Sequence, residues 1–121
     1  MSEPLSPGLY IVATPIGNLG DLSARAADTL RRADLVLAED KRITAKLLAH
    51  AGATTRMHVY HDHSSEADRD AVLGRLASDA VALVSDAGTP LISDPGYKLV
   101  RAARAAGHQV HTVPGPCAAV A

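Results

Sequence analysis

Aromatic side chains are scarce in this sequence, which contains no Phe, no Trp and only three tyrosines, Tyr10, Tyr60 and Tyr97. A core assembled mainly from Ala, Val, Leu and Ile has to pack closely through small side chains. Such packing suits helices that lie tightly on a parallel sheet whose two faces are both covered. At 121 residues, the chain is long enough for one domain with a single core.

The sequence is also poor in cysteine, in net charge and in long apolar runs. Cys117 is the only cysteine, which excludes an internal disulfide and is consistent with a reducing cytoplasm. The formal net charge of −1 excludes a global electrostatic attraction to nucleic acid. Residues 1–7 are polar, and no apolar run approaches the roughly 18 residues of a membrane span. We therefore predict a soluble cytoplasmic protein with no membrane contact.

Short apolar runs alternate with segments of helical periodicity along the chain. Strands are predicted at residues 9–13, 35–38, 57–60, 80–84 and 110–113. Because right-handed crossovers connect such units, the pattern predicts an α/β fold, a five-stranded parallel sheet with helices on both faces. Residues 1–8 are expected to form a flexible lead-in to a domain that covers residues 9–121. The chain ends inside a predicted helix, which indicates a piece of a longer protein.

Capping residues mark where the four predicted helices begin and end. The predicted starts are Asp21, Ser65 with Asp68 as a capping box, and Asp94 followed by Pro95, and the predicted stops are Gly52 and Gly107. The side chains expected to face the core are Leu22, Ala26, Leu30 and Ala33; Ile43, Leu47, Leu48 and Ala51; Ala67, Ala71, Val72 and Leu76; and Leu99, Val100, Ala103 and Ala106.

Residues 80–96 form the most distinctive stretch. A buried strand leads into a loop of small residues from Ser85 to Pro90, and a helix starts at Asp94. A plain turn needs only about 2–6 residues, so the longer corner indicates a loop shaped to lie along a ligand. Open α/β sheets bind ligands at the carboxyl ends of their strands. The other distinctive segments also follow predicted strands, at Pro15 to Gly20, Glu39 to Arg42, His61 to His63 and Pro114 to Cys117.

The nucleotide-binding fingerprints fit this sequence poorly. Gly17 and Gly20 follow the first strand, but Pro15 occupies the place of the first glycine in G-x-G-x-x-G, and no Gly-Lys-Ser/Thr occurs. Asp86 and Asp40, each at or near a strand end, could instead serve as the paired carboxylates of an aspartate-based phosphotransferase with Mg²⁺.

A metal site is also poorly supported by the histidines near the third strand. His61 and His63 would share one face of an extended segment and give a two-ligand clip, whereas a closed zinc site needs about four ligands. We predict no metal.

Five segments of this chain resemble a known family. They are residues 9–19 (LYIVATPIGNL), 38–42 (AEDKR), 61–63 (HDH), 83–96 (LVSDAGTPLISDPG) and 114–119 (PGPCAA). In this order they are similar to the ribosomal RNA small subunit methyltransferase I family, which belongs to the tetrapyrrole methylase superfamily with its class III methyltransferase fold. The resemblance runs from Leu9 to the end of the chain, and the fourth segment is highly specific. Lys41 departs from the family, which usually has Thr there.

The resemblance implies S-adenosylmethionine-dependent methyl transfer to the ribose 2′-hydroxyl of a cytidine in 16S rRNA of the small ribosomal subunit. It implies that this chain is the amino-terminal domain of a two-domain enzyme, with the carboxyl-terminal domain absent here, and a homodimer for the full-length protein. The methyl donor would lie between the domains. Its contacts would come, by similarity, from Pro15, Ser85, Asp86, Ala87, Gly88, Thr89, Ile92, Cys117 and Ala118.

The residues alone leave the catalytic and RNA-binding roles open. A hydroxyl is a poor nucleophile, so a base or an orienting acceptor would help, and the candidates by position are Asp40, Glu39, His61 and Asp86. Candidate cations for the RNA backbone are Lys41, Arg42 and Lys46. The alternatives are a tetrapyrrole (precorrin-type) methylase, the phosphotransferase named above, or a domain that only binds a small molecule or a partner.

Overall fold

The computed structural model describes residues 5–14, 22–60, 65–86 and 94–113. The strands are β1 (Gly8–Thr14), β2 (Leu35–Ala38), β3 (Met57–Val59), β4 (Ala80–Asp86) and β5 (Val110–Val113), and the helices are α1 (Ala24–Arg32), α2 (Lys41–Ala51), α3 (Glu66–Arg75) and α4 (Asp94–Ala105). The strands form one sheet in the order β3-β2-β4-β1-β5, and every pairing is parallel. This arrangement confirms the predicted fold class.

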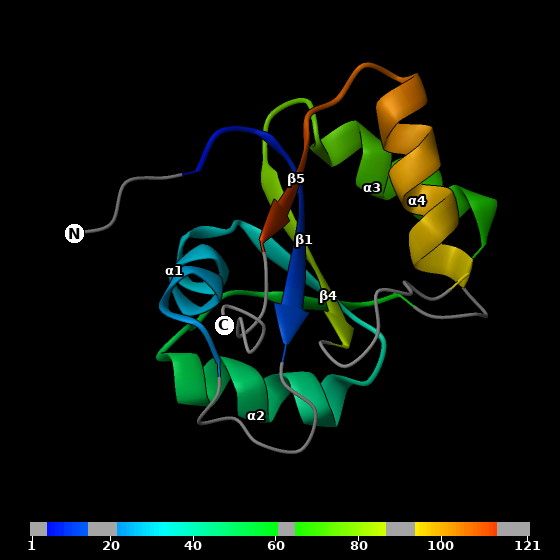
Figure 1. Cartoon of the computed structure of the whole chain (residues 1–121). Coiled ribbons are helices and arrows are strands. Elements are labelled where there is room, and N and C mark those ends of the chain that lie inside the picture. Colours follow the sequence, from blue (N-terminus) through cyan, green and yellow to red (C-terminus); the bar gives the residue numbers. More distant parts are fainter. Residues whose placement is uncertain (1–4, 15–21, 61–64, 87–93, 114–121) are drawn as a thin grey trace, which may run out of the picture.

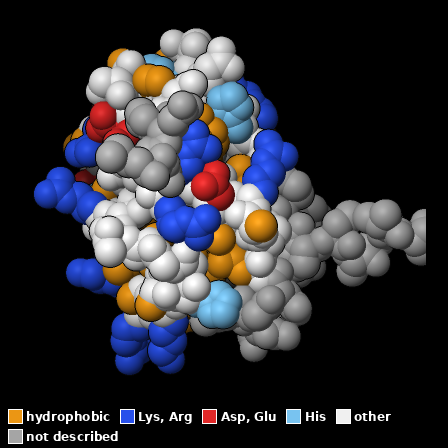
Figure 2. All heavy atoms as spheres, turned by 90° about the vertical axis from the view of Figure 1, so that its left-hand side faces the viewer, with side chains coloured by type: hydrophobic (Ala, Val, Ile, Leu, Met, Phe, Trp, Pro, Cys, Tyr) orange, Lys and Arg blue, Asp and Glu red, His pale blue; other side chains and the backbone are white. Residues whose placement is uncertain are grey.

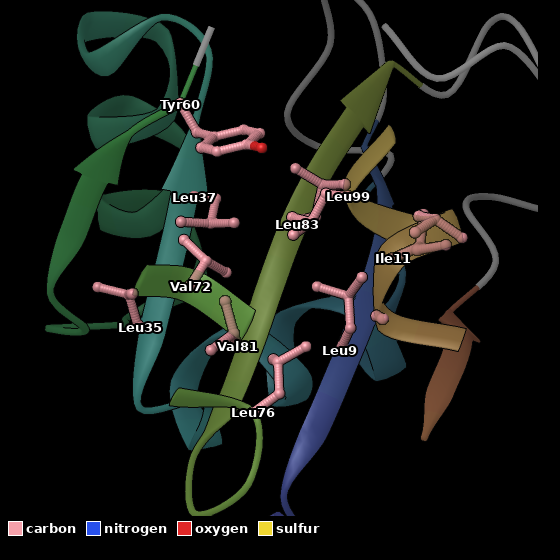
Figure 3. Packing of buried hydrophobic residues seen from close by; sticks show 12 residues of the cluster. Leu9, Ile11, Leu35, Leu37, Tyr60, Val72, Leu76, Val81, Leu83 and Leu99 are labelled. Atoms are coloured by element: carbon pink, nitrogen blue, oxygen red, sulfur yellow. The ribbon is translucent and has the colours of Figure 1, made fainter. Parts of the chain in front are cut away.

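Two apolar clusters hold helices on opposite faces of the sheet (Figure 1). Helices α3 and α4 cover one face, where Leu37, Leu83 and Leu9 lie side by side on three neighbouring strands (Figure 3). Helices α1 and α2 cover the other face, where Val36, Val12 and Ala82 are fully buried. Both faces of the sheet are therefore covered and shielded from water, as the continuous apolar character of its strands requires.

Local signals set most of the element ends. In the capping box of α3, the Ser65 hydroxyl accepts from Asp68 N at 3.2 Å, and the Asp68 carboxylate accepts from Ser65 N at 2.9 Å. Gly52 ends α2 in the left-handed conformation, with φ of +71°, and Gly107 follows α4 with φ of +84°. These predicted helix ends are confirmed. Each depends only on a capping side chain or on a glycine that can adopt positive φ, and both act within a few residues.

The first helix begins later than predicted. Ser23, and not Asp21, is its N-cap, since the Ser23 hydroxyl accepts from Ala26 N at 3.0 Å. Asp21 lies outside the described residues. The predicted bounds of β2 and β5 are confirmed, while β1 and β4 are longer than predicted, and β3 ends at Val59, one residue before Tyr60.

Four predicted core side chains are exposed instead. Ile43 is 66% exposed, because the first turn of α2 lies at the carboxyl edge of the sheet, where none of the described strands covers it. Ala67 and Ala71 are exposed, since α3 packs through Val72 and these two residues lie about 140° and 100° away from it around the helix. Ala106 is exposed because α4 ends at Ala105.

Candidate functional site

The strand order predicts a ligand-binding crevice outside the carboxyl ends of β1 and β4. From β1 the chain crosses to β2 through α1 on one face, whereas from β4 it crosses to β5 through α4 on the other face. Strands β1 and β4 are direct neighbours, and Thr14 pairs with Asp86 at their carboxyl ends. Two neighbouring strands whose connections leave in opposite directions define the switch point at which open α/β sheets bind ligands.

The predicted donor-binding segments follow the strands at this crevice. Ser85 and Asp86 are the last two residues of β4, paired in register with Ala13 and Thr14 of β1. Strand β5 lies on the other side of β1, where Val113 pairs with Val12. The structure thus brings together three strand ends that are far apart in the sequence. The residues beyond them, Pro15, Ala87, Gly88, Thr89, Ile92, Cys117 and Ala118, lie outside the described residues, as does His61.

Asp40 has a structural role that the sequence reading missed. It is the N-cap of α2, and its Oδ1 atom accepts from the backbone N atoms of Arg42 at 2.9 Å and of Ile43 at 3.3 Å. The available signal was an Asp directly before a helical segment and directly after a strand. One carboxylate oxygen is therefore occupied by the helix, which gives the residue a function independent of catalysis. Its neighbour Glu39 is exposed and makes no such bond in the described structure.

A cationic and partly apolar surface lies on the first turns of α2. Lys41, Arg42 and Lys46 are exposed around Ile43, and none of the three forms an ion pair with a described residue. Figure 2 shows that Lys and Arg side chains outnumber acidic ones on the face that carries α1. On that helix the charge is partly neutralised, since Asp28 contacts Arg32 at 3.1 Å and Arg31 at 3.8 Å. The three cations of α2 thus lie at the carboxyl edge of the sheet without an ion pair to a described residue.

Two buried tyrosines stay neutral at physiological pH. Burial raises the pKa of Tyr60, which directly follows β3, while the charge of nearby Arg69 lowers it to a smaller extent. Burial likewise raises the pKa of Tyr10, whose hydroxyl donates to the Ser6 carbonyl at 2.8 Å and whose ring stacks on His111 at 4.6 Å between centroids. Neither group supplies a phenolate base near pH 7.

The described residues hold neither a metal cluster nor a membrane helix. No three His, Cys, Asp or Glu side chains among them could jointly hold a metal ion. None of the described helices is long and apolar enough to cross a bilayer. His61 and His63 lie outside the described residues, and the nearby His58 is an exposed residue of β3.

Comparisons with known proteins give one family name and one recurrent protein name. The sequence model of the family described as Tetrapyrrole (Corrin/Porphyrin) Methylases matches residues 8–121. The ribosomal RNA small subunit methyltransferase I of Xylella fastidiosa is 56% identical over 118 residues, covering 96% of this chain and 43% of the relative. The protein of the same name from Vibrio cholerae is 52% identical over 116 residues, covering 95% of this chain and 40% of the relative. The chain therefore spans about two fifths of the length of these curated relatives.

A solved structure has the same fold. The uroporphyrin-III C-methyl transferase of Thermus thermophilus, complexed with S-adenyl homocysteine, matches with a TM-score of 0.66 at 23% identity, over 89% of this chain and 48% of that chain. At this identity the likeness shows the fold alone.

Proposed function

Because this chain belongs to the tetrapyrrole (corrin/porphyrin) methylase family, we propose that it is the amino-terminal domain of an S-adenosylmethionine-dependent methyltransferase. The observation that carries the proposal is the switch point at the carboxyl ends of β1 and β4, after which the predicted donor-binding segments follow in the sequence. A structural relative of the same fold is complexed with S-adenyl homocysteine, the donor after loss of its methyl group. The sequence also agrees with a ligand that has no diphosphate, because it lacks the glycine-rich phosphate loops.

The proposed substrate is the ribose 2′-hydroxyl of a cytidine in 16S rRNA, presented in the 30S subunit. The names of the relatives at 52% and 56% identity support ribosomal RNA of the small subunit as the substrate class. The cations Lys41, Arg42 and Lys46 lie at the carboxyl edge and are free to contact phosphates. We place the enzyme in the cytoplasm as a homodimer, with a carboxyl-terminal domain that closes the donor site and completes the RNA cleft.

The reaction would be an in-line displacement. The ribose oxygen would attack the methyl carbon of the donor, the carbon–sulfur bond would break, and the hydroxyl proton would pass to a base. Much of the rate would come from positioning, because the reacting atoms must be held roughly 3–3.5 Å apart and aligned. The candidate bases are Glu39, Asp40, His61 and Asp86. Of these, Asp40 already holds the start of α2 with one oxygen.

The test is methyl transfer by the full-length protein. Purified enzyme and tritiated S-adenosylmethionine would be incubated with 30S subunits that lack the modification, and the labelled nucleotide would be mapped. We expect label on the 2′-oxygen of one cytidine. Donor binding without label in 30S subunits, but with label in a tetrapyrrole, would replace the proposed substrate by the other substrate class of the family. A requirement for Mg²⁺ with no donor binding would favour phosphoryl transfer through Asp86 and Asp40.

The isolated residues 1–121 serve as the matched comparison. They carry the strand ends of the crevice but would hold the donor from one side only, whereas a ligand normally buries most of its surface in its pocket. We expect donor affinity to fall by orders of magnitude and transfer to be lost. Equal affinity or equal activity of the isolated chain and the full-length protein would refute the two-domain site.

A further inference from the structure

A hollow of about 420 Å³ lies away from the crevice, between α3 and the edge formed by β2 and β3. Its lining begins at the amino ends of these strands, with Leu35 of β2 and with Arg56 directly before β3. Because parallel strands place all their amino ends at one edge, this end of the hollow faces away from the methyl-transfer site. The volume falls within the range of about 300–1,000 Å³ that is typical of small-molecule sites.

The floor of the hollow is apolar. Leu35 and Val72, both labelled in Figure 3, are buried, and Met57 and Ala71 add apolar surface. His58 lines the hollow beside them. The floor exists because α3 contacts the core through Val72 and turns Ala71 toward the sheet edge. A flat apolar group could therefore lie on it and lose its contact with water.

Two arginines, Arg75 and Arg56, line the hollow. The Nε atom of Arg75 is buried and has no hydrogen-bond partner, although the Nη2 atom of the same side chain contacts the Asp79 carboxylate at 3.1 Å. Asp79 thus orients the guanidinium of Arg75. Arg56 is held by its backbone carbonyl, which accepts from Val36 N at 2.8 Å, and its side chain forms no ion pair with a described residue.

An acidic side chain also lines the hollow. Asp68 precedes Arg75 by seven residues on α3, a separation of about 10 Å along the helix axis. Its Oδ2 atom accepts from Ser65 N, so the carboxylate is held in place while it lines the hollow. The hollow therefore offers cationic donors at one end, a carboxylate acceptor at the other, and an apolar floor between them.

We propose that this hollow, lined by Arg56, Arg75, Asp68 and the floor of Leu35, Ala71 and Val72, binds one nucleotide unit. The phosphate lies against the two guanidinium groups, which suit phosphate oxygens because of their planar donor geometry. The base covers the apolar floor, and a ribose hydroxyl or an exocyclic amino group donates to Asp68. The unit is either a free mononucleotide or a single nucleotide of an RNA strand. The site is separate from the donor crevice and does not depend on methyl transfer.

The test measures binding by the full-length protein at low ionic strength. Isothermal titration with cytidine 5′-monophosphate, adenosine 5′-monophosphate, cytidine and a short single-stranded RNA would be compared for the parent and for Arg56→Gln. Arg104→Gln is the matched control, since Arg104 is exposed on α4 and does not line the hollow. We expect Arg56→Gln to weaken nucleotide binding at least about tenfold, the scale of one charge-assisted contact, and Arg104→Gln to leave it unchanged. Thermal unfolding of each variant checks that the fold is intact.

The same experiment distinguishes a free mononucleotide from a nucleotide of an RNA strand as the ligand. Binding of a monophosphate, with loss in Arg56→Gln, supports a free nucleotide. RNA that binds at least tenfold more tightly than any monophosphate, again with loss in Arg56→Gln, supports a nucleotide of a strand. Unchanged binding of both ligands in Arg56→Gln and Arg75→Gln overturns the proposal. Displacement of the nucleotide by saturating S-adenosylmethionine also overturns it, because the nucleotide would then occupy the donor crevice.

Discussion

Replacement of Asp40 separates a structural carboxylate from a catalytic one. In Asp40→Ala, the backbone N atoms of Arg42 and Ile43 lose the oxygen that accepts from both of them. Loss of such a cap destabilises a protein by about 1 kcal/mol. For a chain of this length, that corresponds to a fall of about 4 °C in the midpoint of thermal unfolding. Asp40→Asn and Asp40→Ser keep an acceptor at the same place, so their midpoints should stay within about 2 °C of the parent.

The activity of the same variants decides whether the carboxylate also acts as a base. A general base contributes about 10²–10⁴-fold to the rate, whereas a cap contributes only through the placement of α2. If Asp40 is a cap alone, Asp40→Asn in the full-length enzyme keeps methyl transfer within a few-fold of the parent. We expect this outcome, because one carboxylate oxygen already holds two backbone donors.

Calorimetry on residues 1–121 measures the stability, and tritiated-methyl transfer by the full-length protein measures the activity. Glu39→Gln is the matched control for stability, since Glu39 is exposed and forms no cap. An Asp40→Ala midpoint equal to that of the parent would refute the capping argument. A loss of about 100-fold in Asp40→Asn, at an unchanged midpoint, would instead establish the carboxylate in the chemistry.

Three further predictions concern the stability of residues 1–121. Leu37→Ala should destabilise the chain by about 3 kcal/mol, because Leu37 is fully buried on β2, between β3 and β4. In the same urea titration, Ile43→Ala should cost less than about 0.5 kcal/mol, because Ile43 is 66% exposed. Gly52→Ala should destabilise the chain by about 1 kcal/mol through the φ of +71° alone, since an added Cβ meets no atom within 4 Å. A loss of stability in Gly52→Asn as large as in Gly52→Ala would contradict this cause. Burial raises the pKa of Tyr60 above that of an unfolded tyrosine, so stability should be constant below about pH 10 and fall as the pH rises further. Urea unfolding at pH 8–11 should show a smaller fall for Tyr60→Phe, and an equal fall would exclude this tyrosine as its source.

Features that depend on a few neighbouring residues were readable from the sequence. The bounds of β2 and β5 follow from continuous apolar runs, and the capping box at Ser65 follows from side chains three residues apart. The stop at Gly52 follows from the freedom of glycine to adopt positive φ. The fold class was predictable for the same reason, because the alternation of short apolar runs and amphipathic segments is itself a local pattern.

The strand order was decided only by the tertiary structure. The rule of right-handed crossovers allows several orders of five parallel strands. No local sequence pattern indicates that β4 lies between β2 and β1. That insertion makes β1 and β4 neighbours and brings their carboxyl ends together. The sequence thus pointed to the segments of the candidate site, while the topology decided that the strands before them end side by side.

Side-chain exposure at the edges of the sheet likewise could not be predicted from the sequence. Periodicity places Ile43 and Ala71 among apolar neighbours, but it contains no information on where a helix passes the last strand or how far it is rotated. The same rotation of α3 leaves the hollow beside Arg75, whose lining comes from β2, β3 and α3. The sequence by itself determined the elements and most of their ends. Only the tertiary structure determined the surfaces between them, because contacts between segments far apart in the chain depend on the packing of whole elements.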